Sequence, residues 1–434
     1  METTHTIVVG AGQAGLAMSA CLSERGHEHV LLERGRIAER WHSERWDSLR
    51  LLTPNWMTRL PGYSYVGPDP DGFMTARQTA RFFADYAAAV TAPVRERTEV
   101  IRLSQVDDGF VVETTTGALR ANNVVIATGW CDQPAIPAAG RALSPDIRQI
   151  VPGEYRNPAR VPSGGVLVVG ASATGVQIAH ELAEHGRDVV LAIGSHRRVP
   201  RRYRGLDVFW WLDQLGTFDR TVDDVDDPWA ARTEAALQLV GRPDHTDLDL
   251  PHLQDQGIRL TGRLLGIDGT RACFDRNVVA TIAAADAQME RLLSRIDDHA
   301  ERSGLAAEVL EPVPFRTVRP FRAVESLDLA AAGVRSVVWA TGYRRRYPWL
   351  ELPILDRRGE IRQRRGVTPV AGAYVLGQRF QRAGAVLAFG QHFQFRPGAA
   401  QSVHQRLPQQ RFVLGDDRGP VARWHVSAPP LRAP

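Results

Sequence analysis

The chain contains no lysine, so all 53 of its basic residues are arginines. They are scattered among 49 acidic residues and leave a net charge of only +4, a pattern typical of a solvated surface, so we expect no nucleic-acid partner. Cysteine is also rare: Cys21, Cys131 and Cys273 form no CxxC pair, which argues against a dithiol redox centre and a cysteine zinc site. No apolar run approaches the roughly 20 residues of a membrane span, and the start of the chain has no signal-peptide pattern. We therefore expect a cytoplasmic protein without a membrane span or a metal site.

What the chain does contain is a glycine-rich loop directly after its first apolar segment. The run "TIVVG" predicts a buried parallel strand, and it leads into "GAGQAG" at residues 10–15 and then into an alanine-rich helical pattern. In such a loop the first glycine allows a tight turn, the second lets a pyrophosphate approach the backbone, and the third lets the helix pack on the strand. A second apolar strand ends at an acid that can bind ribose hydroxyls. The sequence therefore predicts a dinucleotide site formed by Gly10, Gly12, Gln13, Ala14, Gly15, Glu33 and Arg34.

A near copy of this loop, "GASATG", occupies residues 170–175, again between a buried-strand pattern and an amphipathic helix. No acid follows its second strand; the segment "SHRRVPRR" stands there instead. Arginines and a serine hydroxyl would bind the 2′-phosphate of NADPH, which an acid would repel. A solvated basic loop is the alternative interpretation, and NADH remains possible. The predicted second site consists of Gly170, Ser172, Thr174, Gly175, Ser195, Arg197 and Arg198.

Two further strand patterns end in the same three residues, Ala-Thr-Gly. The first, "NNVVIATGW", carries Thr128 and Gly129, and the second, "RSVVWATGY", carries Thr341 and Gly342. Each of these endings returns the chain to a nucleotide-binding sheet. Alternating apolar and polar residues over 99–129 also predict a small β-meander before the first of them.

These repeats predict an α/β fold of two Rossmann-like dinucleotide-binding domains, with the NADPH domain inserted in the FAD domain. The FAD domain would comprise residues 1–159 and 341–382, and its last strand, "AYVLG", would deliver Gly377 toward the flavin. The NADPH domain would span 160–340, with a helical insertion over about 203–304.

Aromatic and amphipathic helices are expected within that insertion. Phe209, Trp210 and Trp211 fall together in one helical pattern, and residues 281–304 form a strong amphipathic pattern. We expect these helices to form core or a homodimer surface, and a substrate lid is the other interpretation.

The two glycine loops, both ATG elements and "YRNP" at residues 155–158 resemble the flavin-containing monooxygenases, a group that includes Baeyer–Villiger and indole-pyruvate monooxygenases. The resemblance implies that Gly10, Gly12, Gly15 and Glu33 bind FAD and that Trp41 lies beside the cofactor. It also places Asn55, with Thr53 next to it, near the isoalloxazine ring as the candidate catalytic group. The alternative for Asn55 is a loop-capping side chain.

The resemblance implies an NADPH-dependent, FAD-containing monooxygenase that acts through a C4a-hydroperoxyflavin. Dioxygen and a small molecule, either a nitrogen or sulfur nucleophile or a ketone, would be its substrates. Two alternatives remain open: an NADPH-dependent flavin oxidoreductase or oxidase without oxygen insertion, and a catalytically silent nucleotide-binding protein. A disulfide reductase is disfavoured because the chain has no CxxC.

The sequence departs from the family pattern in two places. Val151 stands where the monooxygenase fingerprint has a histidine, four residues before Tyr155. Residues 383–434 are rich in Gln, Pro, Arg and His and do not resemble the family ending, so we expect them to be disordered or frameshifted.

Overall fold

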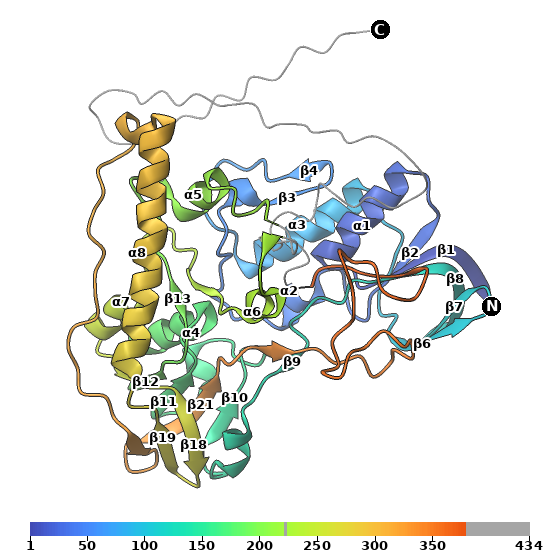
Figure 1. The fold of residues 1–434 in the computed structure, drawn as a ribbon. Helices are drawn as coiled ribbons and strands as arrows, with labels where there is room; N and C mark the ends of the chain where they lie inside the picture. Colours follow the sequence, from blue (N-terminus) through green and yellow to red (C-terminus); the bar gives the residue numbers. More distant parts are fainter. Residues whose placement is uncertain (221–223, 379–434) are drawn as a thin grey trace.

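The computed structural model describes residues 1–220 and 224–378, which form two α/β units built around parallel strands (Figure 1). The expectation for residues 383–434 therefore lies outside the described residues. Within the described ranges, no helix combines the length and the apolar character needed to cross a membrane.

A seven-stranded sheet forms the core of the first unit, in the order β5-β2-β1-β8-β7-β6 with β23 beside β8. Strand β1 pairs in parallel with both β2 and β8, so Val8 lies between Leu31 and Val125. The C-terminal halves of β1 and β8 and most of β2 are apolar because one face of the sheet packs on α1 and α3 and the other on residues 347–361. The bounds are β1 Glu2–Val9, β2 His29–Leu32, β5 Val94–Arg95, β6 Val100–Val106, β7 Gly109–Thr114, β8 Gly117–Ile126, β23 Ala373–Val375, α1 Gln13–Glu24 and α3 Ala76–Ala89.

The predicted meander and the predicted last strand are both confirmed in this sheet. Strands β6, β7 and β8 pair antiparallel in sequence order, and β23 pairs in parallel with the end of β8. The short helix α2 (Glu39–Ser43) and the hairpin of β3 (Arg59–Leu60) and β4 (Tyr63–Ser64) complete this unit.

The second unit contains five parallel strands in the order β10-β21-β11-β12-β17. Helix α4 covers one face, and a small antiparallel sheet of β18, β19 and β20 covers the other. The predicted fold class, two Rossmann-like units with the second inserted in the first, is confirmed. The bounds are β10 Arg148–Ile150, β11 Gly165–Val169, α4 Ala173–Glu184, β12 Val189–Ala192, β17 Arg259–Thr261, β18 Leu264–Asp268, β19 Arg271–Phe274, β20 Ser326–Asp328 and β21 Val334–Trp339.

Two details of the second unit differ from the expectation. Strand β10 already belongs to its sheet, so the unit begins before the expected boundary at residue 160. The stretch 203–304 is not simply a helical insertion, because it contains β17, a strand of the main sheet, and the hairpin of β18 and β19. Strands β10 and β17 each have only three residues, too few to show a period in the sequence.

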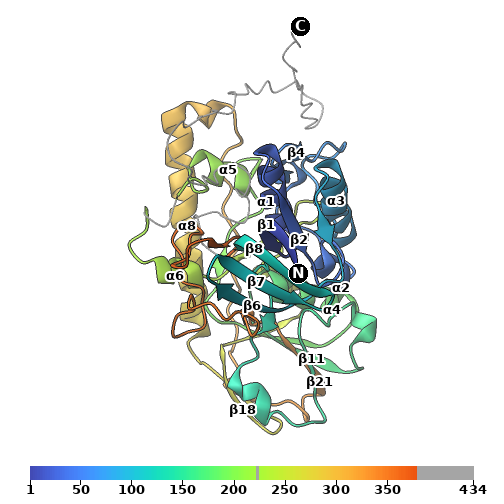
Figure 2. The ribbon, with the colours of Figure 1, turned by 90° about the vertical axis from the view of Figure 1, so that its right-hand side faces the viewer.

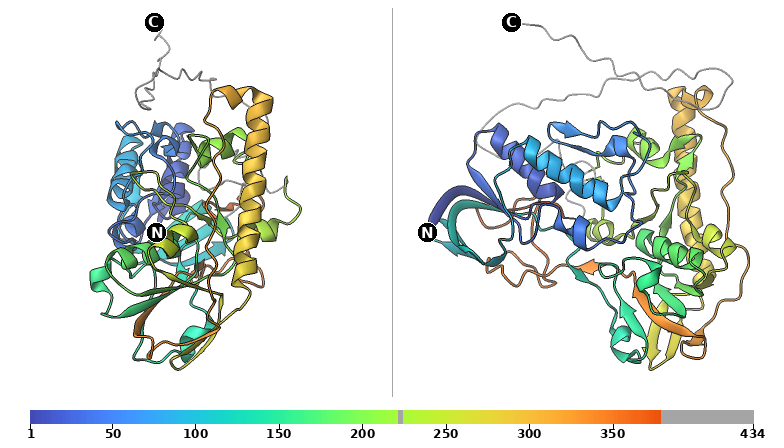
Figure 3. Two further views of the ribbon diagram at one scale, coloured as in Figure 1. Left: turned by 90° about the vertical axis from the view of Figure 1, so that its left-hand side faces the viewer. Right: turned by 180° about the vertical axis from the view of Figure 1, so that it is seen from behind.

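The predicted helices in that stretch are present. Helix α8 (Val278–Ser303) buries residues three or four positions apart, among them Ile282, Ala285 and Met289. Helix α5 (Val208–Gln214) buries Phe209 and Trp211, as the core interpretation expected. Figures 1 and 3 place α8 along the side of the molecule opposite the first sheet. The remaining elements are β13 Arg197–Arg198, β14 Arg202–Tyr203, β15 Leu206–Asp207, α6 Pro228–Thr233, β16 Leu237–Gln238 and α7 Leu250–Asp255.

Two connecting segments join the two units, one after each Ala-Thr-Gly element, and these two segments are in contact with each other. Strand β9 (Gln133–Pro134) on the first segment pairs antiparallel with β22 (Tyr343–Arg344) on the second. The rings of Trp130 and Tyr343 also meet edge to face, with centroids 6.3 Å apart. Figure 2 shows the resulting arrangement, with the first sheet above the strands of the second unit. The repeated sequence therefore builds a paired connection between the units.

Candidate active site

The first glycine loop is tightly packed at two of its glycines and open at the third. A Cβ on Gly10, whose φ is +107°, would lie 2.7 Å from the Ala127 carbonyl oxygen, and one on Gly15 would lie 1.9 Å from the Gly10 carbonyl oxygen. Nothing lies within 4 Å of the corresponding position on Gly12, which caps the start of α1. The open side therefore presents the first N–H groups of α1, which fits a pyrophosphate.

Glu33 lies at the end of β2 beside this loop. Its carboxylate accepts hydrogen bonds from the amides of Ala11 (2.9 Å) and Gly35 (3.0 Å). A carboxylate offers about four acceptor positions, so two remain for ribose hydroxyls. The acid both fixes the loop and keeps acceptors for a ligand, which fits the predicted role.

The second glycine loop has the same geometry as the first. A Cβ on Gly170 (φ +109°) would lie 2.5 Å from the Ala340 carbonyl oxygen, and one on Gly175 would lie 1.8 Å from the Gly170 carbonyl oxygen. Ser172 caps α4 with φ −84° and ψ −178°, close to the −87° and −170° of Gly12. This extended backbone needs no glycine, which explains how a serine replaces the middle glycine.

One cavity of about 1750 Å³ begins at the first loop and continues between the two units. The predicted residues that line it are Gly10, Gly12, Gln13, Ala14, Glu33, Arg34, Trp41, Thr53, Thr128, Gly129, Arg197, Arg198 and Gly377. The predicted residues that do not line it are Gly15, Asn55, Gly170, Ser172, Thr174, Gly175, Ser195, Thr341 and Gly342. Apart from Gly15 and Asn55, this second set belongs to the second loop and its surroundings.

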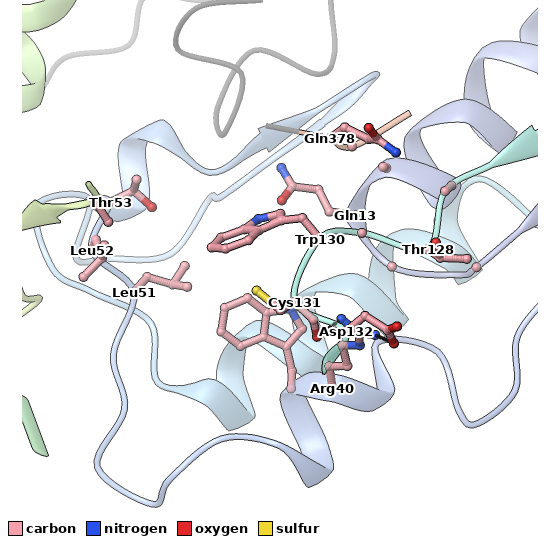
Figure 4. Close-up of a pocket in the computed structure, with 18 of the residues that line it drawn as sticks. Gln13, Arg40, Leu51, Leu52, Thr53, Thr128, Trp130, Cys131, Asp132 and Gln378 are labelled. Carbon is pink, nitrogen blue, oxygen red and sulfur yellow. Dashed lines mark hydrogen bonds and ion pairs between the residues drawn. The ribbon is translucent and has the colours of Figure 1, made fainter. Parts of the chain in front are cut away.

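The cavity wall also contains residues that sequence reasoning missed. Figure 4 shows Trp130 between the Leu51–Thr53 segment and Gln13, with Cys131 beside it. Below them Arg40 pairs with Asp132 at 3.2 Å and also donates to the Cys131 carbonyl. For Trp130, Cys131 and Asp132, the one signal in the sequence is that they directly follow the first Ala-Thr-Gly ending.

The end of β23 forms part of the same wall, because Gly377 and Gln378 line the cavity. This glycine has φ +79°, and a Cβ on it would lie 2.9 Å from the Ala14 side chain at the start of α1. The next residue, Gln378, donates a 2.9 Å hydrogen bond to the Tyr347 hydroxyl. Burial raises the pKa of Tyr347, so this phenol is neutral at physiological pH.

Asn55 is placed differently from the expectation. Its side chain is buried, its Nδ2 donates to the Asp69 carbonyl at 2.9 Å, and its Oδ1 accepts from the Met74 amide at 3.0 Å. It does not line the cavity, whereas Thr53 does. This geometry favours the loop-capping alternative.

The structure contradicts the phosphate-binding hypothesis for Arg198. Its side chain is only 3% exposed and forms ion pairs with Asp286 at 2.6 Å and Asp249 at 2.8 Å. It also donates to the Arg316 carbonyl at 2.6 Å. A phosphate would have to displace these acceptors. Arg197 remains a candidate, since it is 39% exposed and its ion pair with Glu234, at 2.5 Å, lies at the surface.

Arg263 is a basic residue at the second site that sequence reasoning missed. It follows β17, the neighbour of β12 in the sheet. Its Nε lies 3.4 Å from the position that a Cβ on Gly194 would occupy, directly before Ser195. The side chain is exposed and, among the described residues, forms no ion pair with a carboxylate. No pattern in the sequence reveals it, because only the pairing of β17 with β12 brings it there.

Several known proteins are similar to this chain in sequence or in fold. Residues 7–205 match the pyridine nucleotide-disulphide oxidoreductase family. An uncharacterized CzcO-like oxidoreductase of Geobacillus kaustophilus is 31% identical over 389 residues, covering 88% of this chain and 94% of that protein. The indole-3-pyruvate monooxygenase YUCCA8 of Oryza sativa is 31% identical over 224 residues, covering 47% of this chain and 51% of that protein. A flavin monooxygenase variant from Stenotrophomonas maltophilia shares the fold with a TM-score of 0.61 at 17% identity, covering 90% of this chain and 95% of the solved one.

The fold, the two glycine loops and these relatives define an oxidoreductase that uses a flavin and a nicotinamide cofactor. The open cradle at Gly12 and the spare acceptors of Glu33 fit the flavin dinucleotide at the first loop. The chain belongs to the same family as the CzcO-like oxidoreductase of Geobacillus kaustophilus, and it is similar in sequence motifs and in fold to flavin monooxygenases.

Proposed function

We propose that the protein is an NADPH-dependent, FAD-containing monooxygenase acting on a small organic substrate. In the overall reaction, substrate, dioxygen, NADPH and a proton give the oxygenated product, water and NADP⁺. One oxygen atom enters the substrate, and the two electrons of the hydride, together with two protons, convert the other to water.

The size and position of the cavity carry this proposal. Ordinary ligand sites measure about 300–1,000 Å³, and this cavity of about 1750 Å³ is larger. It runs from the first glycine loop past Thr53 to Met57 and Phe209. It therefore has room for a flavin dinucleotide and, beyond it, for an organic molecule.

The chain's own residues would bind, orient and shield the reactants. The N-terminus of α1 would hold the pyrophosphate of FAD, and Glu33 would hold its ribose. The N-terminus of α4 would hold the second pyrophosphate. Bound FAD would supply hydride acceptance and, once reduced, the activation of dioxygen. Trp41, Trp130 and Leu52 line the cavity with apolar surface, which would keep bulk water from the reacting groups.

Spectroscopy and isotope labelling test the proposed reaction. The purified protein should carry flavin absorbance that bleaches when NADPH is added without oxygen. With ¹⁸O₂ and an accepted substrate, the product should gain one labelled oxygen. Hydrogen peroxide formed in equal amount to the NADPH consumed, with no labelled product from a panel of amines, sulfides and ketones, would favour the oxidase alternative. A colourless protein that neither takes up FAD nor oxidises NADPH would exclude both.

The choice of nicotinamide coenzyme gives a second test. Replacing Arg263 by alanine should raise KM for NADPH about 10- to 100-fold, since a hydrogen bond to a charged group contributes about 1.5–3 kcal/mol. KM for NADH should stay unchanged, because NADH lacks the 2′-phosphate. Arg276→Ala, an exposed arginine just before α8, serves as the control. An equal rise for both coenzymes would contradict a phosphate contact.

A further inference from the structure

At the end lined by α5 and α8, the cavity combines positive charge with apolar surface. We call this end the arginine arm. Its charged residues come from β3 and α8, and its apolar residues from α5, α8 and the two chain segments beside them. The arginine arm consists of Arg59, Arg291, Arg295, Met57, Phe209, Leu212, Phe218 and Leu292.

Two arginines of α8 dominate the charge of this arm. Arg291 and Arg295 are one helical turn apart, both are exposed, and both line the cavity. Within the part of the chain that the structure describes, neither forms an ion pair with a carboxylate. Like charges at this spacing repel each other on a helix. An anion bound between them would relieve that repulsion.

The other end of the cavity is electrostatically balanced. There Arg40 pairs with Asp132 at 3.2 Å, and Arg34 lies 4.0 Å from Glu44. The acid that lines the cavity near the second unit, Glu234, is held by Arg197. In the arginine arm, Asp213 lies close enough to Arg59 to interact with it electrostatically, so the positive charge without an acidic partner among the described residues belongs to Arg291 and Arg295.

The apolar residues of the arm belong to one packed cluster. Met57, Phe209 and Leu212 are almost fully buried members of it, and Phe218 and Leu292 pack against them. The parts that face the cavity form an apolar surface beside the guanidinium groups. A ligand that matches both features has an apolar body and one acidic end.

We propose that the arginine arm binds the carboxylate of an apolar organic acid, with the body of the acid against the Met57–Phe209 surface. This inference rests on the proposed function, because it assigns the substrate of that monooxygenase to the organic acids. Amine cations are disfavoured, since Arg291 and Arg295 repel them.

The test is a binding measurement on the holoprotein with three compounds of one shape. Isothermal titration would compare 3-phenylpropionate with its primary amide and with 3-phenylpropylamine. The carboxylate should bind about fivefold more tightly than the amide, and the amine should bind least, an effect appropriate to exposed, partly screened charges. The double variant Arg291→Gln, Arg295→Gln should lose the preference for carboxylate over amide. The control Arg302→Gln removes an exposed arginine of the same helix that does not line the cavity, and it should keep the preference.

Equal binding of carboxylate and amide by the unaltered protein would overturn the inference, and so would an equal loss in Arg302→Gln. These results do not depend on turnover, so they separate the two proposals. Carboxylate binding without labelled product would leave the arm assigned and the monooxygenase reaction refuted. Labelled product from an amine or a neutral sulfide, without carboxylate preference, would support the reaction and refute the arm.

Discussion

Replacing Arg198 by methionine should lower the free energy of unfolding by about 3–5 kcal/mol. The substitution keeps much of the side-chain volume but leaves Asp249 and Asp286 without their shared cation. Those carboxylates are largely buried, and a buried charge without a partner is costly. Chemical denaturation of the holoprotein, followed by circular dichroism, measures the change.

The neighbouring arginine supplies the matched control. Arg197→Met removes an exposed ion pair with Glu234, so it should cost no more than about 1 kcal/mol. Comparing the two variants also tests whether Arg198 has a structural role or binds the coenzyme. If Arg198 bound the coenzyme phosphate, Arg198→Met would raise KM for NADPH alone and leave the unfolding curve in place. That outcome would refute the structural assignment.

The second large effect is expected at the third glycine of each loop. A Cβ on Gly175 would lie 1.8 Å from the Gly170 carbonyl oxygen, so Gly175→Ala must push α4 away from β11. Overpacking of this kind lowers the free energy of unfolding by about 1–3 kcal/mol. The distortion is located in the loop that would hold the coenzyme. We expect the variant to keep its flavin absorbance while the apparent affinity for NADPH falls about tenfold or more, measured by anaerobic flavin reduction.

The first loop should show the reciprocal result. Gly15→Ala should release flavin, because its Cβ would lie 1.9 Å from the Gly10 carbonyl oxygen. Ser172→Gly is the conservative control, since Ser172 has the same extended backbone as Gly12 and its side chain makes no capping hydrogen bond. If Gly175→Ala bleached as readily as the unaltered protein, the second loop would not be the coenzyme site.

The features that could be predicted from the sequence are those that depend on short runs of consecutive residues. The glycine loops, the acid at Glu33, the meander and the final strand before Gly377 each depend on a local pattern of turn residues and apolar runs. The amphipathic period of α8 was visible for the same reason. Backbone geometry at such motifs allows few alternatives, so the sequence alone was sufficient.

The predictions that were wrong or missing concern contacts between residues that are far apart in the chain. Arg197 and Arg198 are adjacent and look equivalent, but only the packing of Asp249 and Asp286 distinguishes the buried one from the exposed one. Arg263 reaches the second site because β17 pairs with β12, and a three-residue strand gives no signal of its own. Local sequence shows which residue types are present, and tertiary packing decides which of them meet a ligand.

The insertion of one unit within the other has a consequence for synthesis. The end of β8 has β23 as its outer neighbour, with Ile126 opposite Val375, so the ribosome must make the whole second unit before this edge is covered. At about 5–20 residues per second, the nascent chain waits on the order of tens of seconds with that edge open. An unpaired strand edge can recruit another chain. Termination after β21 but before residue 373 would thus yield a fragment whose second unit is complete and whose first sheet has an unpaired strand edge.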